Sequence, residues 1–143
     1  LEGIEELIQQ ERPDWALIYG DTNSTLAGAL AAAKLCIPIA HVEAGLRSHN
    51  PAMPEEINRV LTDQVSSLLL CPTETAVNNL EKEGFPYEEI NRLRQQIVSV
   101  GDIMFDAVLY YRERALKEVN LETFGLAKVM LFARYTDKKK LIK

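Results

Sequence analysis

The fold class of this chain follows from residues 15–42, which read WALIYGDTNSTLAGALAAAKLCIPIAHV. The stretch opens and closes with short apolar runs, residues 15–19 and 37–42, which are typical of strands. The first run is continuous, so we expect a strand buried on both faces. Between the runs, residues 25–35 are rich in alanine, which predicts a helix that packs closely on a sheet. This order of elements predicts a parallel β-α-β unit.

The same alternation continues on both sides of this unit. Helices are predicted over residues 1–11, 54–65, 72–83 and 103–118, and further strands over residues 67–71, 97–100 and 129–133. Such an order is typical of a doubly wound parallel sheet with helices on both faces, a Rossmann-like α/β fold. Residues 85–96 are predicted to form a partly helical excursion between two of these elements.

Composition and charge exclude several classes of function. The 143 residues suffice for one ordinary domain, and the net charge of −5 argues against nucleic acid as a partner. The N-terminus shows no secretory signal, and the longest apolar run, residues 26–36, is too short to span a bilayer. We therefore expect a cytoplasmic protein with no membrane partner.

The cysteines and histidines do not predict a metal site. Cys36 and Cys71 are far apart in the sequence, and both lie in apolar surroundings, which predicts buried free thiols. His41 is expected to pack at a strand end and His49 to lie in solvent, because neither has a partner at metal-ligand spacing. We therefore expect no metal in the functional site.

Polar and charged residues follow the predicted strands directly. Asp21 follows the first strand, residues 43–59 follow the second, and residues 73–74 and 101–102 follow the next two. In an open α/β sheet, ligands bind beyond the carboxyl ends of the strands. These residues are therefore expected to share the ligand-binding edge of the sheet.

Three carboxylates, Asp21, Glu43 and Glu55, are expected to converge at this edge. Neighbouring carboxylates ionise unequally, so one can carry a proton while another is ionised. An enzyme needs this combination to remove a proton from one side of a substrate and to return one on the other side. The three side chains are therefore candidates for general acid and base.

Each of these charged residues also has a simpler interpretation. Asp21 or Ser24 would cap the helix that follows. Arg59 lies one turn after Glu55 and Glu56, where a local helix ion pair is commoner than a phosphate contact. No serine or cysteine nucleophile with a nearby base is apparent in the sequence. A glycine-rich dinucleotide motif is also missing, which argues against hydride transfer.

Short motifs along the chain occur in order and at fitting distances: GDT at residues 20–22, HVEAGLR at 41–47, PEEINR at 54–59, PTE at 72–74, and VGD at 100–102 followed by DA at 106–107. Together they closely resemble the non-hydrolysing UDP-N-acetylglucosamine 2-epimerases. The pair HVEAGLR and PEEINR is highly specific for that family. The resemblance covers residues 1–118 well and residues 119–143 poorly.

The resemblance implies an isomerase with two Rossmann-like domains in the GT-B arrangement. A UDP-sugar substrate would lie in the cleft between them, with no cofactor. The implied reaction is anti elimination of UDP across C1–C2 to give 2-acetamidoglucal, followed by re-addition, which interconverts UDP-N-acetylglucosamine and UDP-N-acetylmannosamine. Such enzymes serve cell-surface polysaccharide biosynthesis, and family precedent suggests a homodimer for the full-length protein.

Individual residues match the family's motifs. Asp21, Glu43 and Glu55 correspond to its catalytic carboxylates, which together remove and return the proton at C2. Arg47 and Arg59 are expected mainly to hold the loop and the helix in place, with substrate binding as a further role. The sequence leaves open which carboxylate serves which face of the sugar.

The same resemblance implies that the chain is an incomplete portion of such an enzyme. Residues 1–118 correspond to the later part of the N-terminal domain and the interdomain helix, and residues 119–143 to a truncated start of the C-terminal UDP-binding domain. The family's N-terminal Gly-Thr-Arg-Pro-Glu loop has no counterpart, and residues 133–137 read ARYTD where the family has a His-Arg motif. The chain alone is therefore expected to be inactive.

Four alternatives remain open. Arg47-Ser48, Asn50 and Met53-Pro54 also resemble 2-epimerases that act on UDP-2,3-diacetamido-glucuronate. The half-missing cleft is consistent with a non-catalytic nucleotide-sugar-binding remnant. A hydrolysing epimerase that releases N-acetylmannosamine and a glycosyltransferase of the same architecture are the other two.

Overall fold

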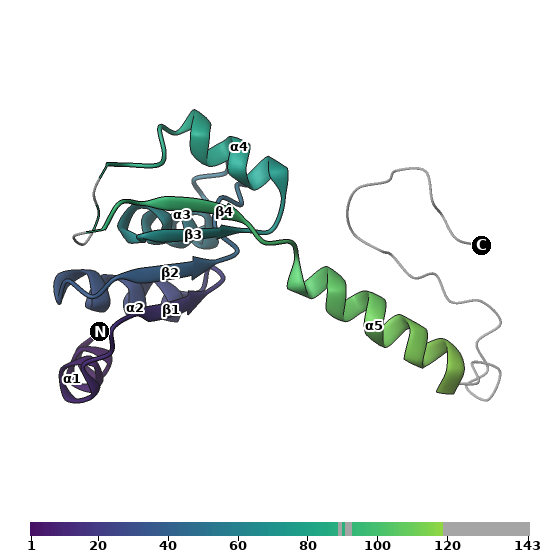
Figure 1. Cartoon of the computed structure of the whole chain (residues 1–143), viewed down its shortest axis with the longest axis horizontal. Coiled ribbons are helices and arrows are strands. Elements are labelled where there is room, and N and C mark those ends of the chain that lie inside the picture. The colour runs from purple at the N-terminus through teal and green to yellow at the C-terminus, as the bar shows by residue number, and fades with distance from the viewer. Residues whose placement is uncertain (89, 91–92, 119–143) are drawn as a thin grey trace. The chain divides into compact units, whose positions relative to one another are not determined.

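A computed structural model of the chain describes residues 1–88, 90 and 93–118 (Figure 1). Their helices and strands follow in the order α1 (Glu2–Glu11), β1 (Ala16–Tyr19), α2 (Asn23–Lys34), β2 (Ile39–Val42), α3 (Pro54–Val65), β3 (Leu68–Cys71), α4 (Glu74–Lys82), β4 (Gln96–Ser99) and α5 (Ile103–Glu118). The chain divides into two compact units, Leu1–Ile103 and Met104–Lys143. The strand predicted over residues 129–133 lies outside the described residues.

The four strands form one parallel sheet in the order β1-β2-β3-β4. This arrangement confirms the predicted α/β class with a parallel sheet. The register places Ile18 beside His41, and His41 beside Leu69. Because lateral neighbours in a sheet point to the same face, these side chains belong to one face.

Helices α2, α3 and α4 pack on that same face of the sheet. Ala29 of α2 clusters with Ile39, Leu80 of α4 clusters with Leu69, and α3 reaches His41 through Asp63. Figure 1 shows α2 and α3 on one side of the strands. Right-handed crossovers between sequential neighbouring strands require this arrangement. The second helical layer of a doubly wound sheet is therefore not among the described helices of residues 1–103.

Strand β1 is less buried than the sequence predicts. Leu17 and Tyr19 are 55% and 61% exposed, whereas Ile18 points toward α2, where a Cβ atom on Gly28 would lie 3.1 Å from its Cδ1. The prediction that this strand is buried on both faces is therefore wrong for the described residues. An apolar run shows that a strand is apolar on both faces, but not that both faces are covered.

The helix ends lie largely where the sequence predicts them. Helix α3 begins at Pro54 and ends at Val65 as predicted, with a proline and two glutamates in its first turn. The predicted cap of α2 is wrong, because Thr22 holds that position. Its hydroxyl accepts a hydrogen bond from the backbone of Thr25, whose own hydroxyl accepts one from the Thr22 backbone.

Two further expectations need correction. Cys36 is exposed, in a left-handed turn between α2 and β2 (φ 58°), so only Cys71 is a buried thiol. The described part of residues 85–96 contains no helix, and an isolated bridge joins Ile90 to Leu93. None of the described helices has the length and apolar character needed to cross a membrane.

Candidate active site

The three predicted carboxylates lie at the carboxyl ends of the strands. Asp21 follows β1 after one glycine, Glu43 follows β2 directly, and Glu55 is in the first turn of α3. The amide of Gly20 donates to the carbonyl of Val42 at 3.1 Å, which extends the pairing of β1 and β2 by one residue. A Cβ atom on Gly20 would lie 3.9 Å from Oε2 of Glu43. The turns that carry Asp21 and Glu43 are therefore direct neighbours.

Two residues of α3 hold Asp21 in place. Nη2 of Arg59 donates to Oδ2 of Asp21 at 2.5 Å, and Nδ2 of Asn58 donates to the Asp21 carbonyl at 2.9 Å. The Asp21 side chain keeps 33% of its surface exposed, whereas that of Arg59 keeps 12%. Arg59 thus forms both the predicted helix pair, with Glu56 at 3.0 Å, and a longer-range pair that orients a candidate catalytic group.

Of the two neighbouring glutamates on α3, Glu56 is structural. It is 7% exposed and accepts hydrogen bonds of 2.9 Å from the amide and hydroxyl of Ser48 and from the amide of His49. Burial would raise the pKa of Glu56, but these hydrogen bonds and the charge of Arg59 outweigh it and lower the pKa. Glu56 therefore anchors the loop before α3.

Glu43 and Glu55 are placed differently from Glu56. Within the described part of the chain, neither side chain forms an ion pair or a side-chain hydrogen bond, and both are half-buried. Glu43 also has a φ of 70°, a conformation that non-glycine residues rarely adopt and that is enriched at functional sites. Both carboxylates are thus available for proton transfer.

A buried charged cluster lies beneath this edge. Nδ1 of His41 lies 2.6 Å from Oδ1 of Asp63, and Nη1 of Arg47 donates to Oδ2 of Asp63 at 2.8 Å. The same guanidinium forms two 2.7 Å hydrogen bonds with Glu83. Burial would lower the pKa of Arg47, but Glu83 and Asp63 raise it instead. With a side chain 1% exposed, Arg47 holds the loop in place, as predicted.

The sequence did not single out Asp63 or Glu83. Asp63 lies near the end of α3 and Glu83 directly follows α4, and each finds its partners far away in the sequence. One signal was present: Glu56, Arg59 and Asp63 recur at helical spacing on α3, so they form a charged stripe on one face. Such a stripe predicts a buried ion-pair network when that face packs on a sheet.

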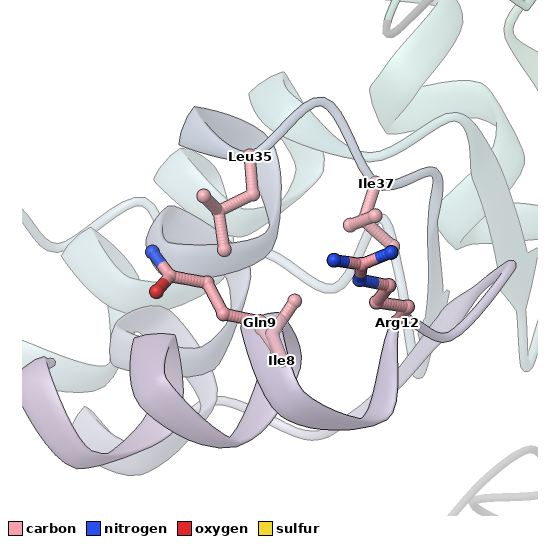
Figure 2. A pocket seen from close by; sticks show the side chains of 5 residues that line it. All are labelled: Ile8, Gln9, Arg12, Leu35 and Ile37. Carbon is pink, nitrogen blue, oxygen red and sulfur yellow. The ribbon is translucent and has the colours of Figure 1, made fainter.

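The described residues form no metal cluster at this edge. Among the described residues, no group of three His, Cys, Asp or Glu side chains could hold a metal ion. Figure 2 shows an open hollow lined by Ile8, Gln9, Arg12, Leu35 and Ile37. Because Leu35 follows α2 and Ile37 precedes β2, this hollow lies at the amino ends of the strands, away from the carboxylates.

The site and fold agree with known proteins. A family model described as UDP-N-acetylglucosamine 2-epimerase matches residues 1–136. The chain belongs to this family. A UDP-2,3-diacetamido-2,3-dideoxy-D-glucuronate 2-epimerase of Pseudomonas aeruginosa is 58% identical over 118 residues, which is 82% of this chain and 32% of that protein. A UDP-N-acetylglucosamine 2-epimerase of Methanocaldococcus jannaschii is 51% identical over 121 residues, 85% of this chain and 31% of that protein.

A solved structure extends the comparison. The crystal structure of the M. jannaschii UDP-GlcNAc 2-epimerase in complex with UDP-GlcNAc and UDP superposes with a TM-score of 0.71 at 50% identity, covering 86% of this chain and 32% of that one. Such neighbours are of GT-B type, which confirms the predicted Rossmann-like architecture for the part covered. The matching part of this chain spans about a third of the length of these relatives.

Proposed function

We propose that this chain supplies the acid–base carboxylates of a UDP-N-acetylglucosamine 2-epimerase. The protein that contains it would interconvert UDP-N-acetylglucosamine and UDP-N-acetylmannosamine by anti elimination of UDP and re-addition to 2-acetamidoglucal. The main support is that Asp21, Glu43 and Glu55, which match the family's catalytic motifs, follow neighbouring strands at one edge of the sheet. The UDP-sugar is a proposal for this chain, supported by relatives crystallised with UDP-GlcNAc.

Epimerisation at C2 needs a base and an acid, and this edge of the sheet carries carboxylates that can serve as both. The proton at C2 is weakly acidic, so its removal needs a positioned base, and its return to the opposite face needs an acid. Asp21 is fixed by Arg59, whereas Glu43 and Glu55 make no ion pair with the described residues. We assign the three carboxylates together to proton removal and return. Direct contact of Arg47 or Arg59 with the substrate stays a prediction.

The leaving group needs a second set of residues. UDP departs with its charge concentrated on the diphosphate, which requires cationic groups or amide donors around it. The chain spans about a third of its relatives, and the predicted UDP-binding domain would begin at residue 119, beyond the described residues. We therefore expect the 143-residue chain to show no epimerase activity alone.

A chimera tests the proposal. The segment of the M. jannaschii epimerase that matches this chain is replaced by the chain's own 121 matching residues. The chimera is incubated with UDP-N-acetylglucosamine in deuterated water, and deuterium at C2 is measured by mass spectrometry. We expect the chimera to incorporate deuterium and the 143-residue chain to incorporate none.

Variants of the chimera identify the carboxylates. Asp21→Asn, Glu43→Gln and Glu55→Gln are each expected to lower the rate of incorporation by roughly a hundredfold or more. Glu5→Gln, on the exposed surface of α1, is the matched control and should keep the full rate. A chimera with the circular dichroism of a folded protein but no deuterium incorporation would overturn the proposed function.

A second sugar is the main alternative. The P. aeruginosa relative, at 58% identity, is named for UDP-2,3-diacetamido-2,3-dideoxy-D-glucuronate, which also carries an acetamido group at C2. Both UDP-sugars are offered to the chimera and to a matching chimera built from the P. aeruginosa protein. The sugar at which deuterium is incorporated identifies the substrate. The expected homodimer and the cytoplasmic location stay predictions. If the chain is a non-catalytic remnant, neither chimera should incorporate deuterium at C2.

A further inference from the structure

His41 is held between two groups that accept hydrogen bonds. Its Nε2 lies 2.8 Å from the carbonyl oxygen of Gly20, and its Nδ1 lies 2.6 Å from Oδ1 of Asp63. The side chains of His41 and Asp63 are both fully buried. A carbonyl oxygen only accepts, which means that Nε2 must carry a proton.

The surroundings of Asp63 decide the state of the other ring nitrogen. Oδ2 of Asp63 accepts hydrogen bonds from Nη1 of Arg47 at 2.8 Å and from the amide of Gly45 at 3.1 Å. Two donors, one of them a guanidinium, favour an ionised carboxylate. An ionised Asp63 can only accept, so Nδ1 of His41 must carry a proton as well. The ring is therefore an imidazolium.

The charges around the ring balance. Arg47 and protonated His41 supply two positive charges, and Asp63 and Glu83 supply two negative ones. Cys71 of β3 adds no charge at neutral pH, because burial first, and then the charge of Asp63, raises the pKa of its thiol to about 12.

We propose that His41 is a protonated positioning residue whose ion pair with Asp63 ties two turns of the active site to α3. One turn is Gly20–Asp21, through the Gly20 carbonyl, and the other is residues 43–47, through the Gly45 amide and Arg47. These turns carry Asp21 and Glu43. The catalytic consequence rests on the proposed function, whereas the protonation state of the ring does not.

Histidine NMR tests the protonation state directly. The chain has two histidines, and His49 is exposed, so it serves as an internal reference. In the 15N-labelled chain at about pH 8, where an exposed histidine is neutral, both ring nitrogens of His41 should carry protons and those of His49 should share one. His49→Gln assigns the signals. A His41 ring that loses a proton together with His49 would overturn the proposal.

Substitution of Asp63 by asparagine gives a sharper test. The amide oxygen of the new side chain would still accept from Gly45 and Arg47, while its NH2 group would donate to Nδ1 of a neutral His41. We therefore expect Asp63→Asn to leave the fold intact and to remove one ring proton from His41 at about pH 8. Two ring protons that persist in the variant would contradict an ion pair with Asp63.

The positioning role is tested in the chimera. Asp63→Ala removes the acceptor, so kcat should fall by roughly tenfold to a hundredfold while KM changes little. Asp63→Asn, which keeps the hydrogen bonds, should restore most of kcat. An Asp63→Ala chimera that is folded and has an unchanged kcat would overturn positioning. If the unsubstituted chimera incorporates no deuterium, the proposed function fails, but the NMR result still decides the ion pair.

Discussion

Gly45 lies directly against the backbone of Ala76 in the first turn of α4. A Cβ atom on Gly45 would come within 2.4 Å of the Ala76 carbonyl oxygen and 2.8 Å of its carbonyl carbon. Asn79 strengthens this contact, because its Nδ2 donates to the Gly45 carbonyl at 3.0 Å. The turn that follows Glu43 is therefore pinned to α4 as well as to α3, and only glycine fits there.

Substitution of Gly45 by alanine should strongly destabilise the chain. The residue has a φ of 76°, so alanine adds backbone strain to the clash with Ala76, and we expect a loss of about 3 kcal/mol or more in the free energy of unfolding. Gly84→Ala is the matched control, because Gly84 has a φ of 92° and nothing within 4 Å of an added Cβ. It should cost about 1–2 kcal/mol. If urea denaturation shows that Gly45→Ala and Gly84→Ala lose the same free energy of unfolding, the close contact with Ala76 is contradicted.

Glu56 should make the stability of the chain depend on pH in the acid range. Because the pKa of Glu56 is lowered from 4.5 in the folded state, its ionised form stabilises the fold above that value. This contribution is lost as the pH falls through the folded pKa. Glu56→Gln should therefore destabilise the chain by about 1–3 kcal/mol at neutral pH. The difference from the parent chain should shrink on acidification.

The neighbouring carboxylate provides the control for this pH effect. Glu55 lies one residue away in the same helical turn and forms no ion pair with the described residues. Glu55→Gln should leave the urea denaturation curve close to that of the parent at neutral pH, apart from any weak helix-dipole effect. If Glu56→Gln unfolds at the same denaturant concentration as Glu55→Gln at every pH, the hydrogen bonds from Ser48 and His49 do not stabilise the loop.

The sequence predicted the order of elements well because that order is local information. The bounds of α3 followed from Pro54 and the two glutamates behind it, and the shared edge of Asp21 and Glu43 followed from the geometry of parallel strands. Burial was predicted less well, since it depends on what covers a surface. Leu17 and Cys36 are apolar residues in apolar runs, but the described helices do not cover them.

The part of the site that escaped sequence analysis is the buried cluster. His41 and Asp63 are 22 residues apart, and Arg47 and Glu83 are 36 residues apart, so neither pair has a local signature. The burial of His41 at a strand end was predicted and is confirmed. Its partners could be identified only after the packing of α3 and α4 on the sheet was known. A helix can be predicted from its local sequence, whereas an ion pair between distant elements depends on the tertiary structure.

Adjacent residues of β1 should respond very differently to truncation. Ile18 faces α2, where its Cδ1 lies 3.1 Å from the place of a Cβ on Gly28, while Leu17 is 55% exposed. Ile18→Ala should lower the free energy of unfolding by about 2–3 kcal/mol, and Leu17→Ala by about 0.5 kcal/mol or less. Chemical denaturation measures both variants. A cost at Leu17 equal to that at Ile18 would show that the other face of β1 is also covered in solution.

The two cysteines should react at very different rates with a disulfide reagent. Cys36 is exposed, whereas Cys71 is fully buried and burial raises the pKa of its thiol to about 12. At about pH 8 roughly one Cys71 thiol in ten thousand is ionised, and the reagent cannot reach it without an opening of the core. We expect one rapid reaction per chain in native buffer and a second only in denaturant. Cys36→Ser should remove the rapid reaction, and a rapid reaction that survives in this variant would mean that β3 is accessible from the edge of the sheet.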